Sequence, residues 1–124
     1  MLSFPANVTL YLAATAVDFR KSFDGLAAIV ENQFKVEPMN GDVFVFLNRR
    51  ASQVRLLFWE RDGFCLISKR LECGTFRRID KGDGTQAHIE IDASELVMLL
   101  EGIEAKAVPR RKRYVRPNTR KNAA

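Results

Sequence analysis

Three apolar runs in the middle of the chain restrict its fold more than any other feature. They are rich in β-branched and aromatic side chains, are joined by short polar connections, and occupy residues 43–47, 54–59 and 64–71. Runs of this kind are typical of consecutive antiparallel strands. The second connection contains Asp62 and Gly63, which favour the positive backbone angles of a tight hairpin turn. The sequence therefore predicts an antiparallel β-meander.

Apolar side chains occupy both faces of these predicted strands. Val43, Val45 and Leu47 alternate with Phe44 and Phe46 in the first run. An antiparallel sheet with a free face usually carries polar side chains there. We therefore expect both faces to be covered, by helices on one side and, as a hypothesis, by a partner subunit on the other.

Further elements flank the meander. Residues 8–12 alternate as a short strand does, and residues 22–34 carry apolar side chains at the three-and-four spacing of a helix, with Ser22 as its N-cap. Residues 86–91 suggest one more strand. Asp92 and Glu95 then resemble a capping box that opens a helix ending at Gly102. The predicted fold class is α+β, an antiparallel meander sheet with packed helices.

Length and composition predict one domain followed by a basic tail. The chain has 124 residues, of which 47% are hydrophobic and 28% charged, as in a soluble globular domain. Residues 106–124 contain no acidic side chain. Their basic residues are Lys106, Arg110, Arg111, Lys112, Arg113, Arg116, Arg120 and Lys121. We expect a domain over residues 1–105 and a disordered basic tail over residues 106–124.

The charge is distributed unevenly between these two parts. Of 20 Lys and Arg and 15 Asp and Glu, residues 1–105 keep twelve basic and all fifteen acidic side chains. Arginine binds phosphate through two hydrogen bonds, so the tail is predicted to bind a polyanion such as DNA. RNA, an acidic protein surface and a purely solubilising extension remain alternatives for this segment.

A second basic cluster is predicted within the meander. Arg49 and Arg50 follow its first strand, and Lys69 and Arg70 lie in its third. These side chains are candidates for a strip that contacts phosphates or an acidic partner. The alternative, which the sequence favours slightly, is charge that protects a strand edge from aggregation.

Catalytic and metal-binding readings receive little support. A metal-dependent nuclease would use converging carboxylates, and the candidates are Asp18, Glu60, Asp62 and Glu72. Asp62 is better explained by its turn, and the glutamates by pairing with arginines on neighbouring strands. His88 has no partner pattern of a general base. Cys65 and Cys73 lack the spacing of a zinc site, and reduced thiols are favoured over a disulfide. No catalytic residue, metal or cofactor is expected.

The sequence also indicates where the protein acts. No Lys or Arg precedes Arg20, so the charged leader of an exported protein is missing, and no apolar stretch has the length of a membrane span. We expect a cytoplasmic protein that associates with the nucleoid when bound to DNA.

Several sequence blocks together resemble one protein family. Residues 17–26 resemble its opening pattern D-x-R-K-x-x-D-G-L, and further blocks follow in its order and spacing at residues 41–50, 59–64, 69–76 and 99–103. The family is the small accessory protein of the IS sixty-six family of bacterial insertion sequences, the second open reading frame product, also called TnpB. The resemblance covers about residues 8–117.

The resemblance implies a role in DNA transposition beside a separate transposase that carries out strand transfer. It implies no catalytic residue for this subunit. The expected function is a non-enzymatic transposition accessory that binds DNA at the ends of the element and can form a homo-oligomer. An adaptor or regulator of the transposase with little DNA contact is the alternative, and a metal-dependent nuclease is a weaker one.

Overall fold

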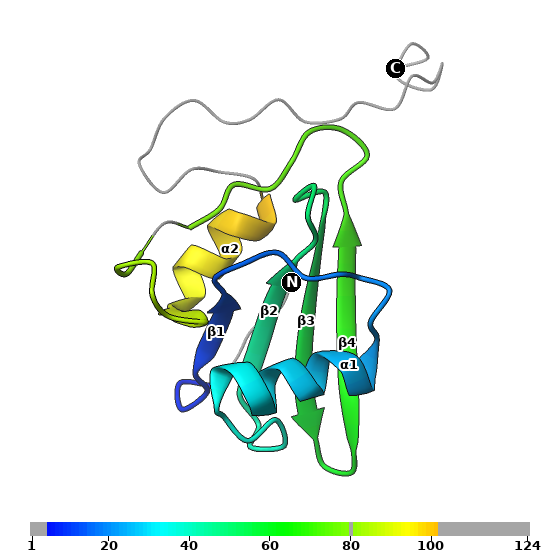
Figure 1. Cartoon of the computed structure of the whole chain (residues 1–124), viewed down its shortest axis with the longest axis vertical. Coiled ribbons are helices and arrows are strands. Elements are labelled where there is room, and N and C mark those ends of the chain that lie inside the picture. The colour runs from blue at the N-terminus through cyan, green and yellow to red at the C-terminus, as the bar shows by residue number, and fades with distance from the viewer. Residues whose placement is uncertain (1–4, 80, 102–124) are drawn as a thin grey trace.

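The computed structural model describes residues 5–79 and 81–101, which form a mixed α+β domain (Figure 1). Its elements in chain order are β1 (Leu10–Ala13), α1 (Phe23–Ile29), a π-helical turn η1 (Val30–Phe34), β2 (Val43–Leu47), β3 (Gln53–Glu60), β4 (Gly63–Arg70), β5 (His88–Ile91) and α2 (Ala93–Glu101). The strands of the predicted meander agree with these bounds to within one residue. The predicted tail, residues 106–124, and the predicted helix end at Gly102 lie outside the described residues.

The strands form one five-stranded sheet in the order β4-β3-β2-β1-β5. β2, β3 and β4 are antiparallel neighbours, which confirms the meander. The short strand predicted over residues 8–12 corresponds to β1, but the sequence did not predict its position in the sheet. It lies parallel to β2 and antiparallel to β5. A parallel neighbour requires a crossover connection, and the helical segment of α1 and η1 supplies it. The sheet is therefore mixed.

Both faces of the sheet are covered from within the chain. Phe44 and Phe46 of β2 pack in a cluster with α1 and η1, which cross one face of the sheet (Figure 1). Val45 and Leu47 pack on the other face with Leu96 and Leu99 of α2. The expectation that both faces are covered is confirmed. α2 packs on the face where the sequence suggested a partner subunit, so covering that face requires no second chain.

The two helical segments begin differently. Ser22 occupies the predicted N-cap position of α1, but its side chain makes no capping hydrogen bond. At α2 the capping box is present: the Glu95 amide donates to Asp92 Oδ1 at 2.7 Å, and the Asp92 amide donates to Glu95 Oε1 at 2.9 Å. These bonds satisfy backbone donors that the first turn of a helix leaves unpaired.

The β3–β4 connection is a tight hairpin turn, as predicted, but the turn lies one residue earlier than the predicted Asp62 and Gly63. Glu60 pairs with Gly63, so Arg61 and Asp62 form the turn. The positive φ angle belongs to Arg61, at 58°, and Gly63 is the first residue of β4. Trp59 and Phe64 stack edge to face across the two strands, with ring centroids 5.0 Å apart, and this contact reinforces the hairpin.

Other sequence-level expectations concern single side chains. Cys65 and Cys73 are free thiols, of which Cys65 is half-buried and Cys73 is exposed. Partial burial raises the pKa of the Cys65 thiol, and its hydrogen bond to the Glu60 carboxylate acts in the same direction. Within residues 5–79 and 81–101, neither helix has the length and apolar character needed to cross a membrane.

Candidate functional site

A pocket of about 490 Å³ opens at one end of the sheet, between the segment that follows β1 and the β2–β3 loop. Its polar lining residues are Asp18, Arg20, Asn48, Arg49 and Arg50. Three arginines against one aspartate give the lining a net positive charge. The pocket also joins two of the sequence blocks that carry the family resemblance, residues 17–26 and 41–50.

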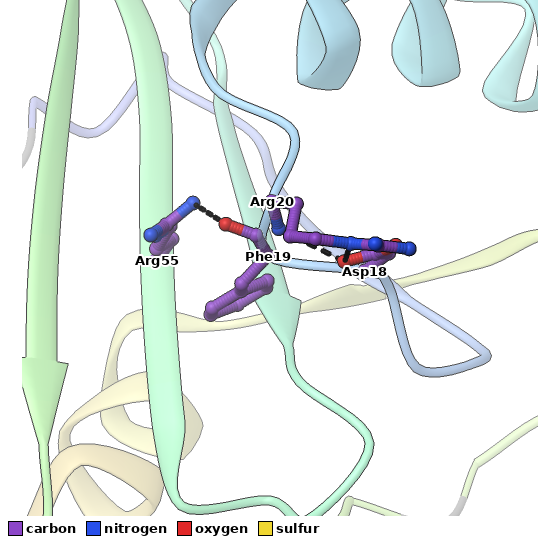
Figure 2. A network of polar contacts seen from close by, with 4 residues as sticks. All are labelled: Asp18, Phe19, Arg20 and Arg55. Carbon is purple, nitrogen blue, oxygen red and sulfur yellow. Dashed lines mark hydrogen bonds and ion pairs between the residues drawn. The ribbon is translucent and has the colours of Figure 1, made fainter.

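Asp18 and Arg20 shape the first wall of this pocket. The Arg20 guanidinium donates to Asp18 Oδ2 from Nε at 3.0 Å and from Nη2 at 2.8 Å, and the Arg20 amide donates to Asp18 Oδ1 at 2.9 Å (Figure 2). These hydrogen bonds hold the pKa of the Asp18 carboxyl at about 2. Asp18 therefore stays ionised, and its charge holds the Arg20 side chain in a defined position.

Arg55 fixes the same wall from the sheet. Its side chain extends from β3, and Nη1 donates to the carbonyl oxygen of Phe19 at 3.0 Å (Figure 2). The same Nη1 also donates to the Lys21 carbonyl at 2.8 Å. Its guanidinium carbon lies 4.4 Å from the centroid of the Phe19 ring, a cation–π arrangement. Arg55 thus attaches the segment carrying Asp18 and Arg20 to the sheet.

Asn48 organises the second wall. Its side-chain oxygen accepts hydrogen bonds from the amides of Ser52 at 2.9 Å and Gln53 at 3.0 Å, and its side-chain nitrogen donates to Ser52 Oγ. Its carbonyl accepts from the amide of Ala51, whose φ angle is 55°. Asparagine commonly holds turns in this way. The loop that carries Arg49 and Arg50 is therefore well defined.

The two walls are also joined to each other and to the rest of the fold. The Val17 amide donates to the Leu47 carbonyl at 2.9 Å, which ties the first wall to the end of β2. The Phe76 amide donates to the Ala51 carbonyl, which holds the second wall against the segment after β4. The pocket is thus formed before any ligand binds, and binding would cost little ordering of its backbone.

The predicted basic residues of the meander fall into two environments. Arg49 and Arg50 are exposed at the pocket, and no ion pair or hydrogen bond engages their guanidinium groups within residues 5–79 and 81–101. Lys69 instead donates to the Leu100 carbonyl at 2.7 Å, and Arg70 pairs with Glu72 at 3.0 Å. Adjacent residues of a strand also point to opposite faces. The structure therefore places Arg20, Arg49 and Arg50 at the pocket, and Lys69 and Arg70 are not among its lining residues.

The remaining sequence candidates do not gather at this pocket. Glu60 and Asp62 lie at the β3–β4 turn, while Glu72 follows the opposite end of β4. Among the residues the structure describes, no three His, Cys, Asp or Glu side chains form a group that could hold a metal ion. His88 packs between the rings of Tyr11 and Phe34, with ring centroids 5.0 and 4.9 Å away, and its Nδ1 has no hydrogen-bond partner among residues 5–79 and 81–101.

Some predicted contact residues lie outside the described part of the chain, and some residues of the site were not predicted. The predicted tail contacts, Arg110, Arg111, Lys112, Arg113, Arg116, Arg120 and Lys121, lie outside the described residues. Sequence reasoning did not single out Arg20 or Arg55. The sequence does contain a signal for Arg55. It is the one charged residue between Val54 and Trp59, and it shares its strand face with the apolar Leu57, where a charged side chain needs a partner.

Fold and site together define a small α+β domain with a preformed, arginine-lined surface pocket. Residues 8–110 match the family model described as IS66 Orf2 like protein. The chain therefore belongs to the IS66 Orf2-like family, and it is a transposition-associated accessory protein of the insertion-sequence type.

Two curated relatives from Sinorhizobium fredii (strain NBRC 101917 / NGR234) resemble the chain over most of their lengths. Uncharacterized protein y4jC is 31% identical over 111 residues, which cover 90% of this chain and 92% of the relative. Uncharacterized protein y4hO is 34% identical over 104 residues, which cover 84% and 88%. No solved structure matches the chain.

Proposed function

We propose that this accessory protein assists transposition by binding DNA phosphates and that it catalyses no reaction itself. The observation that carries the proposal is the pair Arg49 and Arg50. Both are exposed beside Arg20 on a well-defined loop, and their guanidinium groups have no partner among the described residues. Guanidinium groups match phosphate oxygens bidentately.

The charge pattern supports different roles in DNA binding for residues 106–124 and for the pocket. Residues 106–124 carry eight basic and no acidic side chains, and the preceding 105 residues carry more acidic than basic ones. In this proposal the tail supplies most of the affinity for DNA, and the pocket supplies a fixed contact that orients the domain on the backbone. Lys69 and Arg70 contribute less, because neither lines the pocket and Lys69 already donates to the Leu100 carbonyl.

The partners in this proposal are the ends of the element and the transposase encoded with it. DNA is reached in the bacterial cytoplasm, at the nucleoid. Phosphate contacts alone carry no sequence information. Preference for the element ends therefore comes from the transposase or from the shape of the DNA.

A salt titration of DNA binding tests the proposal. If the full chain neutralises about six phosphates, the slope of log K against log salt concentration is about −5. A chain ending at Ala105 should lose most of this slope and most of the affinity at low salt. The double variant Arg49→Ala, Arg50→Ala should reduce the slope by about 2, since each lost phosphate contact removes about 1. Fluorescence anisotropy on element ends and on unrelated duplexes measures both quantities.

The matched control is Lys69→Ala, Arg70→Ala, which removes the same number of cations from the same meander. We expect its slope to stay close to that of the full chain. Equal effects of the two double variants would show that only total charge matters and would contradict the role of the pocket. Unchanged binding after removal of residues 106–124 would contradict the role of the tail.

The adaptor alternative makes a different prediction. A packed apolar interface with the transposase survives salt that releases phosphate contacts. Pull-down of the transposase at about 1 M salt, where the screening length is about 3 Å, distinguishes the two. Retention of the transposase together with absent DNA binding at low salt would favour an adaptor over the proposed DNA contact.

A further inference from the structure

β4 forms one edge of the sheet, and its outer side has no strand partner within residues 5–79 and 81–101. From Gly63 to Ser68 the strand carries no charged residue and no proline, and its apolar side chains Phe64, Leu66 and Ile67 are only half-buried. Natural edge strands are usually protected by charges, prolines or bulges. This edge is open over most of its length.

The hydrogen-bond register shows which backbone groups of β4 face outward. The two-residue turn closes on the pair Glu60 and Gly63, and the ladder continues past the strand, where the Leu71 amide donates to the Ser52 carbonyl at 2.8 Å. Odd-numbered residues of β4 therefore direct their backbone groups toward β3. The amides and carbonyls of Phe64, Leu66 and Ser68 point away from the sheet.

The charges at the two ends of β4 are opposite in sign. Asp62 immediately precedes the strand, and Lys69 and Arg70 end it. In an antiparallel pair of identical strands, outward-facing residues must lie opposite outward-facing residues. Centring the pair on Leu66 meets this condition. It sets Leu66 opposite itself, Phe64 opposite Ser68, and Asp62 of each copy opposite Arg70 of the other.

We propose that β4 pairs antiparallel with β4 of a second copy of this chain, centred on Leu66, so that one continuous sheet crosses both copies. Apolar side chains meet in the middle of the interface, and the acidic and basic ends of the strand meet at its two margins. The pair Arg70–Glu72 is exposed, with side chains 66% and 53% accessible, so Arg70 exchanges it for Asp62 of the partner at little cost. A register centred on Ile67 lacks this charge pairing.

The oligomeric state of the full chain tests the proposal. Sedimentation equilibrium over about 1–100 µM should show a monomer–dimer equilibrium, since edge pairing of this size is expected in the micromolar range. Ser68→Pro removes an outward-facing amide without touching the β3 ladder, as proline is tolerated on the outer side of an edge strand. We expect this variant to be monomeric throughout the range.

Ser68→Ala is the matched control, because it keeps the amide and should still dimerise. Circular dichroism checks that the proline variant keeps its fold. A wild-type chain that is monomeric at every concentration would overturn the proposal. A dimer that survives Ser68→Pro with its fold intact would overturn it as well, since its interface would lie elsewhere.

Cysteine cross-linking tests the register independently of fold stability. Centring on Leu66 sets Cys65 opposite Ile67 of the partner, in a pair without backbone hydrogen bonds whose Cα separation of about 4.5 Å suits a disulfide. In a Cys73→Ser background, Ile67→Cys should form a covalent dimer on oxidation, and Lys69→Cys should not. Cross-linking of Lys69→Cys alone would place the centre on Ile67 and overturn the proposed register.

Discussion

Asp18 and Arg20 show how two exposed side chains can fix the wall of a pocket. The Arg20 side chain is 91% and the Asp18 side chain 46% accessible to solvent, and an isolated ion pair at the surface contributes little to stability. Their role is geometric, because the two hydrogen bonds from Arg20 to Asp18 orient the Arg20 guanidinium. Arg55 holds the residue between them, Phe19, by a hydrogen bond to its carbonyl oxygen. Arg20 is thus held in position by Asp18, whereas the guanidinium groups of Arg49 and Arg50 have no partner within residues 5–79 and 81–101.

The Asp18 carboxyl provides a prediction at this scale. Its pKa in the folded chain, about 2, lies below the ordinary 3.8. Folding therefore favours the ionised form, and this contribution is present above about pH 4 and lost as the pH falls through 2. NMR titration of the carboxyl carbon should give the low value in the wild type, and Arg20→Gln should return it toward 3.8.

Lys21→Gln is the control for that titration, since Lys21 acts on Asp18 only as the smallest of the contributing charges. We expect the pKa of Asp18 to change little in this variant. An Asp18 carboxyl that titrates near 3.8 in the wild type would show that the Arg20 fork is not formed in solution.

At the scale of single elements, the two helices α1 and α2 differ in whether their N-terminal capping residues make hydrogen bonds. The capping box at α2 is a local pattern, because Asp92 and Glu95 are three residues apart and bond each other's amides directly. Ser22 stands at the equivalent position of α1 and is an equally plausible cap by sequence, yet its hydroxyl makes no capping bond.

This difference predicts unequal effects of two similar substitutions. Asp92→Ala should lower the free energy of unfolding by about 1 kcal/mol, because it leaves a helix amide unpaired. Ser22→Ala should change it by less than about 0.5 kcal/mol, within the range of ordinary surface substitutions. Urea unfolding followed by circular dichroism measures both. Equal losses in the two variants would contradict the assigned caps.

The elements that sequence reasoning predicted well are those set by local patterns. β2 was predicted with its observed bounds because its residues alternate within a continuous apolar run, and the turns on either side of β3 are short. The parallel pairing of β1 with β2 was not predicted, since Leu10 and Val43 are separated by a helix and no local signal specifies their register. Likewise, the meeting of Arg20 with Arg49 in one pocket depends on that long-range pairing.

At the scale of the whole molecule, the central strand connects two apolar layers. Every residue of β2 is buried, and its side chains alternate between the cluster under α1 and the cluster under α2. A substitution that disturbs the packing of one apolar cluster therefore also disturbs the other, because both clusters include side chains of β2. We expect the described domain to unfold as one cooperative unit.

Phe44→Ala tests this expectation. The ring is fully buried and stacks with Tyr11 at 5.4 Å. Its removal should cost about 3–5 kcal/mol. Phe23→Ala is the control, because that ring is 42% exposed and should cost far less. Fluorescence of Trp59 and far-ultraviolet circular dichroism should give coincident urea transitions in both variants. Separate transitions would contradict a single unit.

The pairing of β1 with β5 has a consequence for synthesis of the protein on the ribosome. Ala13 lies opposite His88, so one side of β1 has no partner until 75 further residues have been translated. At about 5–20 residues per second this interval lasts roughly 4–15 s. During that time the nascent chain carries an unpaired strand edge that can bind chaperones or neighbouring nascent chains. The edge of β1 is paired only after β5 has left the exit tunnel.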